Sequence, residues 1–346
     1  MRDFEVYWTA GTRAAAAQPL YRAEDGHYQF KYLPAFAVAA IPLSWLSLST
    51  AKFAWFLSSV ALLIALLALT LKLLPQRRRS NGLILIVVII AMAKFYGHEL
   101  VLGQVNILFV VLVVTALLAV RRRRTTVSAL LLVASFVVKP YGILLLAWLA
   151  VVGGVRTAAV SVVGIAIVLA LAVPLYGFEG TLALHRTWWT AVTQSTAPNL
   201  TNPDNVSVAA FAAKWLGDAS SVPAIVFSVL LVVVAAVVVI KGAGVEHREA
   251  LDGALLLTLV PLLSPQGWDY VFLVATPAIA LIVNYDDHLP ALLRLLAWIA
   301  IAAIGLSIYD ILGRQLYARF MELSIITPCF FVVIAALAML RQRRIA

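Results

Sequence analysis

The sequence predicts an all-α membrane protein that crosses the bilayer many times. Of its 346 residues, 63% are hydrophobic and only 12% are charged, and the mean hydropathy is +1.00. A soluble globular protein is about half apolar and about a quarter charged, so the composition excludes a soluble enzyme and a disordered chain. The apolar residues are also grouped in runs close to the ~20 residues that span a bilayer as a helix.

These apolar runs predict the helices in chain order. They cover residues 51–74, 82–97, 106–120, 157–174, 222–240, 250–263, 270–284, 291–308 and 323–340. Two further stretches are the apolar segment 34–48 and the amphipathic first part of the loop 176–207. We expect them to be external juxtamembrane helices, the first in the membrane plane or re-entrant and the second anchored by Trp188 and Trp189.

Residues 127–153 predict two half-length helices, 127–138 and 141–153, separated at Lys139 and Pro140. Each is ~18 Å long at ~1.5 Å per residue, too short for a ~30 Å hydrocarbon core. Irregular backbone is tolerated at that depth only beside protein or a water-filled cavity, so we expect a recessed, water-accessible break. Counting both halves gives about eleven transmembrane or half-membrane helices in a single domain over residues 1–346.

Basic clusters orient these helices. By the positive-inside rule the clusters lie in the cytoplasm. There the basic residues behind the net charge of +10 contact anionic lipid head groups, so this charge does not indicate nucleic-acid binding. The clusters are Arg77 to Arg79, Arg121 to Arg124, Lys241 with Arg248, and Arg341, Arg343 and Arg344. The long polar stretches then face the other side, so we expect the chemistry there. Residues 1–33 contain no apolar core of a signal peptide.

The first candidate site residues are Asp3 and Glu5, which precede Tyr7. On a helix, positions 3 and 5 point about 200° apart, so only one of them can face a cavity. Tyr7 lies on the same face as Asp3, which would place a carboxylate beside a ring suited to sugar stacking. Such a carboxylate can serve as a general base. The alternative is an amphipathic interfacial helix with no catalytic role.

Four cations are candidates for binding an anionic phosphate: Lys31, Lys139, Arg314 and Arg319. Lys139 is the most informative, because a cation within an apolar run is costly and usually functional. It could instead pair with a carboxylate or with backbone carbonyls. Lys31 could equally be an anchor at the membrane surface, and the two arginines a solvated face.

Neutral and aromatic side chains on the same side of the membrane are candidates for binding sugar hydroxyls. Gln104 and Asn106 follow Gly103, which permits close backbone approach, and further along lie Asn205, Trp268 and Asp269. Asn106, Asn205 and Asp269 could instead cap helices. His98 has no second histidine at ligand spacing, so the sequence predicts no metal site, and we expect no cofactor.

Taken together, these segments resemble glycosyltransferase family 87 of the integral-membrane GT-C superfamily. The shared order is an acidic Asp3-Phe-x-x-Tyr start, a Tyr-x-Pro helix start at Pro34, Gly-Gln-x-Asn at 103–106, the Lys-Pro break, Asn-x-Ser at 205–207 and a Ser-Pro-x-x-Trp turn at 264–268. The similarity spans roughly residues 3–290. Family members usually have a helix before the aspartate, and mycobacterial mannosyltransferases carry a histidine after the Trp, where this chain has Asp269 and Tyr270.

The resemblance implies a GT-C-type bundle in the plasma membrane with its active site on the non-cytoplasmic face. It implies a polyprenyl-phosphate sugar donor, mannose above all, a lipid-linked or glycan acceptor, and inversion without a nucleotide sugar. The family's base maps onto Asp3. Two alternatives remain open from the residues alone: a multi-pass lipid or solute transporter or flippase, and a catalytically inactive scaffold.

Overall fold

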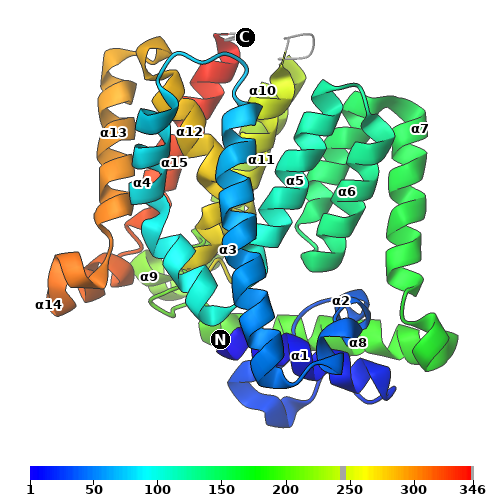
Figure 1. Cartoon of the computed structure of the whole chain (residues 1–346). Coiled ribbons are helices and arrows are strands. Elements are labelled where there is room, and N and C mark those ends of the chain that lie inside the picture. The colour runs from blue at the N-terminus through cyan, green and yellow to red at the C-terminus, as the bar shows by residue number, and fades with distance from the viewer. Residues whose placement is uncertain (242–246, 344–346) are drawn as a thin grey trace. The chain divides into compact units, whose positions relative to one another are not determined.

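The computed structural model describes residues 1–241 and 247–343. Every regular element in these residues is a helix, and β-type pairing is limited to an isolated bridge between Asn205 and Trp268. This confirms the all-α prediction. The chain divides into two compact units, Met1–Leu66 with Glu99–Ser195, and Leu67–His98 with Thr196–Ala346. The α-helices of both are labelled in Figure 1.

In the first unit, α5, α6 and α7 pack side by side, and α2 contacts α6 and α7. Two other helices, α1 and α8, run across the direction of this group (Figure 1). The helices of the unit are α1 (Arg2–Ala15), η1 (Ala23–Tyr28), α2 (Pro34–Ala39), η2 (Ile41–Trp45), most of α3 (Leu48–Leu73), α5 (Asn106–Arg121), α6 (Thr125–Val138), α7 (Gly142–Ala170) and nearly all of α8 (Val173–Asn199).

The break at Lys139 and Pro140 is confirmed. Helix α6 ends at Val138, and Lys139 is extended, with φ −148° and ψ 130°. The reason is local, because proline crowds the preceding residue out of the helical region. The second short helix also ends near its expected boundary: Gly154 has φ 77° and ψ 178°, and α7 then continues to Ala170.

Both stretches expected to form juxtamembrane helices are helical. Residues 34–45 form α2 and η2, with Pro34 at the first turn of α2, where its missing N–H costs nothing. Helix α8 bends at Gly177, which has φ 71°. The indole of Trp188 donates a hydrogen bond to the carbonyl of Lys31 at 3.1 Å, so α8 is tied to the polar N-terminal segment.

In the second unit, α15 packs against α11, α12 and α13, and α10 packs against α9 and α11. Between α13 and α14 the chain bends by 103°. The helices are most of α4 (Asn81–Leu102), α9 (Val208–Leu216), η3 (Gly217–Ser220), α10 (Ser221–Lys241), α11 (Arg248–Leu263), η4 (Asp269–Ala275), α12 (Thr276–Asn284), η5 (Asp286–His288), α13 (Ala291–Leu306), α14 (Tyr309–Glu322) and α15 (Ile326–Gln342).

Within the described residues, 4 helices are long and apolar enough to cross a membrane, or up to 5 if α13 and α14 form one bent span. The four are Leu48–Leu73, Asn81–Leu102, Gly142–Ala170 and Val208–Lys241. The last of these joins α9, η3 and α10. Side chains such as Val155 and Ile225 stay largely exposed on these helices, which suits lipid better than water. The described residues are thus all-helical in their regular structure, and their long apolar helices fit a membrane protein. The expected number of about eleven crossings stays a prediction.

Candidate active site

Two glycines let α1 lie close to its neighbours in the first unit. A Cβ at Gly11 would stand 2.5 Å from the carbonyl oxygen of Ala40, and one at Gly103 would stand 2.9 Å from Cβ of Phe4. Gly103 also has φ +76°, a conformation that L residues rarely adopt. The Gly103 turn thus brings Gln104, the next residue, against the first turn of α1.

At this contact four polar side chains form a hydrogen-bonded cluster. The Gln104 amide donates from Nε2 to Oδ2 of Asp3 at 2.5 Å. Its Oε1 accepts from the hydroxyl of Tyr7 at 2.9 Å and from that of Tyr32 at 3.2 Å, and the two hydroxyls are 2.7 Å apart. Gln104 therefore fixes the orientation of the Asp3 carboxylate, and Asp3 and Tyr7 lie on one face of α1 as the helical spacing predicted.

Glu5 points elsewhere, as expected for a residue two positions from Asp3. It forms an ion pair with Lys52 of α3. Asp3 is thus the carboxylate of this pair that joins the Gln104 cluster.

A second carboxylate, Glu99, is buried at the end of α4. It accepts from Nδ2 of Asn106 at 2.7 Å and from the backbone N–H of Ile107 at 2.9 Å. Glu99 thereby caps the start of α5, because it satisfies an N–H that has no partner within the helix. Asn106 keeps its Oδ1 buried without a hydrogen-bond partner. Such an atom is costly unless a ligand or water reaches it.

Lys139 brings a positive charge to these carboxylates. Its ammonium interacts electrostatically with Glu99 and Asp3. It also lies over two aromatic rings, 5.7 Å from the centre of Tyr32 and 5.9 Å from that of Tyr141. The break between α6 and α7 is what directs this cation out of the apolar helices and into the polar cluster.

Lys31 lies on the same side of the first unit, next to Tyr32 in the chain. Burial lowers the pKa of its ammonium, and attraction to the Asp3 carboxylate opposes that change. The structure therefore brings together six of the predicted site residues. They are Asp3, Tyr7, Lys31, Gln104, Asn106 and Lys139.

Replacing Gly103 with alanine should weaken the packing of α1 against the Gly103 turn. The added methyl group meets Phe4, and the left-handed backbone is strained for alanine, so we expect destabilisation by more than ~1 kcal/mol. Thermal unfolding in detergent measures this. Gly82→Ala is the matched control, because a Cβ there has no atom within 4 Å. Equal unfolding temperatures for the two variants would show that the close contact is unimportant.

The remaining predicted residues belong to the second unit. Asn205 is buried, and its side-chain amide forms hydrogen bonds to backbone groups. Its Nδ2 donates to the carbonyls of Asn199 and Pro265, and its Oδ1 accepts from the backbone N–H groups of Ser207 and Gly267. Its contact with sugar hydroxyls stays a prediction. Asn205 holds the 264–268 turn against the loop before α9.

Asp269 is also buried, and its role in binding sugar or acceptor stays a prediction. Its Oδ2 lies 2.7 Å from Nζ of Lys94, and its Oδ1 lies 3.6 Å from Nδ1 of His98. The preceding Trp268 forms the bridge with Asn205. Asp269 begins η4, but its carboxylate is engaged by the basic residues of α4 rather than by the helix start.

Lys94 was not predicted as a site residue, although a cation inside the apolar run 82–97 is a visible signal. Its ammonium also lies 4.9 Å from the ring centre of Tyr317. Arg314 and Arg319, the other predicted phosphate contacts, lie exposed on α14. Their role in binding phosphate is a prediction that the geometry of the second unit leaves open. In residues 1–241 and 247–343, no group of three or more His, Cys, Asp or Glu side chains could hold a metal ion.

The model of glycosyltransferase family 87 matches residues 30–265, more than half of the chain. No curated protein and no solved structure matches it. The matched range includes Lys31, Gln104, Asn106 and Lys139, while Asp3 and Tyr7 precede it and join the cluster through Gln104. The chain belongs to glycosyltransferase family 87.

Proposed function

We propose that this glycosyltransferase moves a hexose, mannose by its resemblance to the family, from a polyprenyl-phosphate donor to a lipid-linked or glycan acceptor. The observation that carries the proposal is the pairing of an oriented carboxylate with a nearby cation. Asp3 is held by Gln104, and Lys139 interacts with it electrostatically. A base and a phosphate-binding cation are the two groups that transfer from a sugar phosphate needs.

In the proposed reaction, Asp3 takes the proton of an acceptor hydroxyl as that oxygen attacks the anomeric carbon of the donor sugar. The bond between this carbon and the phosphate oxygen breaks, and polyprenyl phosphate leaves with the electron pair. Lys139, with Lys31 beside the cluster, stabilises the negative charge that grows on the phosphate. Attack from the face opposite the leaving group inverts the anomeric centre.

We further propose a GT-C-type bundle in the plasma membrane with this site on the non-cytoplasmic face. The support is the distribution of charge. The basic loop of Arg121 to Arg124 precedes α6, whereas Lys139 follows it at the other end of the same helix. By the positive-inside rule the arginine end is cytoplasmic, which directs the Lys139 end toward the outer side.

The donor class can be tested directly. Membranes that contain the overproduced protein are incubated with radiolabelled polyprenyl-phosphate mannose, glucose or galactose, or with the corresponding nucleotide sugars, and the products are separated. We expect label from polyprenyl-phosphate mannose in a new lipid or polymer product. Transfer from a nucleotide sugar alone would contradict the proposed donor, and transfer from another polyprenyl-phosphate hexose would contradict mannose.

Lys139→Met should weaken use of the donor. Loss of a charged hydrogen-bonding group costs about 1.5–3 kcal/mol, which corresponds to about a ten- to hundredfold rise in donor KM or fall in kcat/KM. Lys139→Arg keeps the charge and is the matched control, expected to retain part of the activity. Unchanged donor kinetics in Lys139→Met would make this lysine a structural residue.

A further inference from the structure

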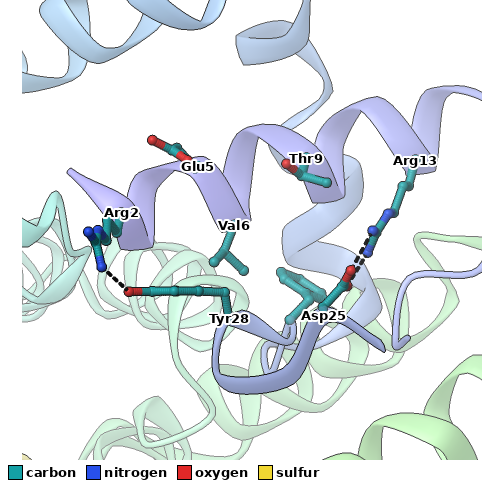
Figure 2. A pocket seen from close by; sticks show the side chains of 8 residues that line it. Arg2, Glu5, Val6, Thr9, Arg13, Asp25 and Tyr28 are labelled. Atoms are coloured by element: carbon teal, nitrogen blue, oxygen red, sulfur yellow. Dashed lines mark hydrogen bonds and ion pairs between the residues drawn. The ribbon is translucent and has the colours of Figure 1, made fainter. Parts of the chain in front are cut away.

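A cavity of about 320 Å³ lies beside α1 in the first unit. It is lined by side chains of α1 and of the segment 25–30, as Figure 2 shows. Those of α1 are Arg2, Glu5, Val6, Thr9 and Arg13, and the opposite wall is Asp25, Tyr28 and Phe30. Its volume is within the range of about 300–1,000 Å³ typical of small-ligand sites.

Two contacts hold the walls of this cavity together. Arg13 donates to both carboxylate oxygens of Asp25, at 2.5 and 2.8 Å, and Arg2 donates to the hydroxyl of Tyr28 at 3.0 Å (Figure 2). The paired Arg13 guanidinium holds the pKa of Asp25 below its ordinary value, so this carboxylate stays ionised at neutral pH. The two contacts preform the cavity, because they fix segment 25–28 to both ends of α1.

The charge on the cavity walls is balanced. Arg2 and Arg13 carry two positive charges, and Glu5 and Asp25 carry two negative ones. Glu5 also forms an ion pair with Lys52, which does not line the cavity. A site for an anionic phosphate would need an excess of cations, whereas a neutral ligand with many hydroxyls matches alternating donors and acceptors.

The cavity also offers apolar contacts of the kind a sugar ring needs. Val6 lies on its α1 wall, and Tyr28 lies opposite and is 39% exposed. One face of a hexose ring carries C–H groups that pack on such surfaces, while its edge carries the hydroxyls. The polar rim of Glu5, Thr9 and Asp25 can bind these hydroxyls.

We propose that this cavity binds a neutral sugar unit of the acceptor, remote from the hydroxyl that reacts. The proposal rests on the proposed transferase function. Arg2, which lines the cavity, precedes Asp3 in the chain, and Asp3 accepts a hydrogen bond from Gln104 in the neighbouring cluster. An acceptor glycan seated in the cavity therefore extends past the start of α1 toward the base.

A binding measurement tests the cavity independently of turnover. Purified protein in detergent is titrated with methyl α-mannoside, methyl α-glucoside and methyl α-galactoside, and saturation-transfer NMR follows binding. We expect at least one to bind, and Thr9→Tyr, which fills the cavity, to weaken that binding by about tenfold or more. Tyr28→Ala, which opens the cavity and removes its ring, should also weaken it. Thr12→Tyr is the matched control, because Thr12 is an exposed residue of α1 outside the lining.

The temperature of thermal unfolding is measured for each variant. If one of the two cavity variants, Thr9→Tyr or Tyr28→Ala, folds poorly, the binding result of the other one tests the proposal. Absence of binding by all three glycosides, or equal binding in Thr9→Tyr, Tyr28→Ala and wild type, would overturn the proposal. Tighter binding of mannose 6-phosphate than of methyl α-mannoside would overturn it too, since it would mark an anion site. If the protein fails these binding tests but still transfers sugar, the proposed transferase function is retained and only the role of this cavity is rejected.

Discussion

Asp3→Asn is expected to lower sugar transfer by about 10²–10⁴-fold, the usual contribution of a well-placed general base. Asparagine has nearly the same shape, and its carbonyl oxygen can still accept the hydrogen bond that Gln104 donates to Asp3. The fold of the cluster should therefore persist while proton abstraction is lost. Steady-state kinetics with a polyprenyl-phosphate sugar donor measures the loss in kcat, and donor binding should change little.

Glu24→Gln is the matched control for Asp3→Asn. Glu24 is an exposed carboxylate of η1 that lies outside the Gln104 cluster and the cavity lining. The Glu24→Gln variant should transfer sugar at the wild-type rate. Wild-type activity in Asp3→Asn would remove Asp3 from the base role. Equal losses in both variants would indicate a general disturbance of the N-terminal segment instead of a catalytic defect.

Asp269→Asn is expected to destabilise the second unit strongly. Removing one partner from a buried ion pair costs about 3–5 kcal/mol, because the other charge is left buried without compensation. In wild type the side chains of Lys94 and Asp269 are only 4% and 2% exposed. For a unit of this size the loss corresponds to a fall in unfolding temperature on the order of 10 °C, which intrinsic tryptophan fluorescence in detergent can follow.

Asp287→Asn is the matched control for this prediction. Asp287 pairs with Arg78 at 2.6 Å, but both side chains are well exposed, at 37% and 40%. Exposed pairs contribute at most about 1 kcal/mol, so this variant should unfold close to the wild-type temperature. Adding Lys94→Met to Asp269→Asn should recover stability, because it removes the uncompensated charge. An Asp269→Asn protein as stable as wild type would contradict a stabilising role of the pair.

Local signals made much of the fold predictable. Pro140 and the polar Lys139 mark the break between α6 and α7, and both act on their immediate neighbours in the chain. Long apolar runs mark the helices because bilayer thickness sets their length. Length does not decide the crossings in the same way for shorter apolar helices such as Asn106–Arg121, which can cross the bilayer or be buried in the protein.

The pairing of site residues depends on contacts distant in the chain. The sequence indicates Asp3 and Gln104 separately, but no periodicity can join residues 101 positions apart. Asp269 had an obvious local interpretation as a helix-start residue, and its actual partner Lys94 lies in another helix. Asn205 was selected for its residue type, whereas its buried amide serves the backbone. Residue type suggests chemistry, and the partners that a side chain meets in the fold decide which part of that chemistry it can perform.

The most direct test of sugar transfer by this protein distinguishes bond cleavage from lipid movement. Purified protein is reconstituted in liposomes with lipid extract from its native membrane as acceptor source, and polyprenyl-phosphate [¹⁴C]mannose is supplied. We expect release of polyprenyl phosphate and appearance of the label in a new glycolipid or glycan, both strongly reduced in Asp3→Asn. Label that crosses the bilayer while it remains on the intact donor would identify a flippase and contradict the proposed sugar transfer.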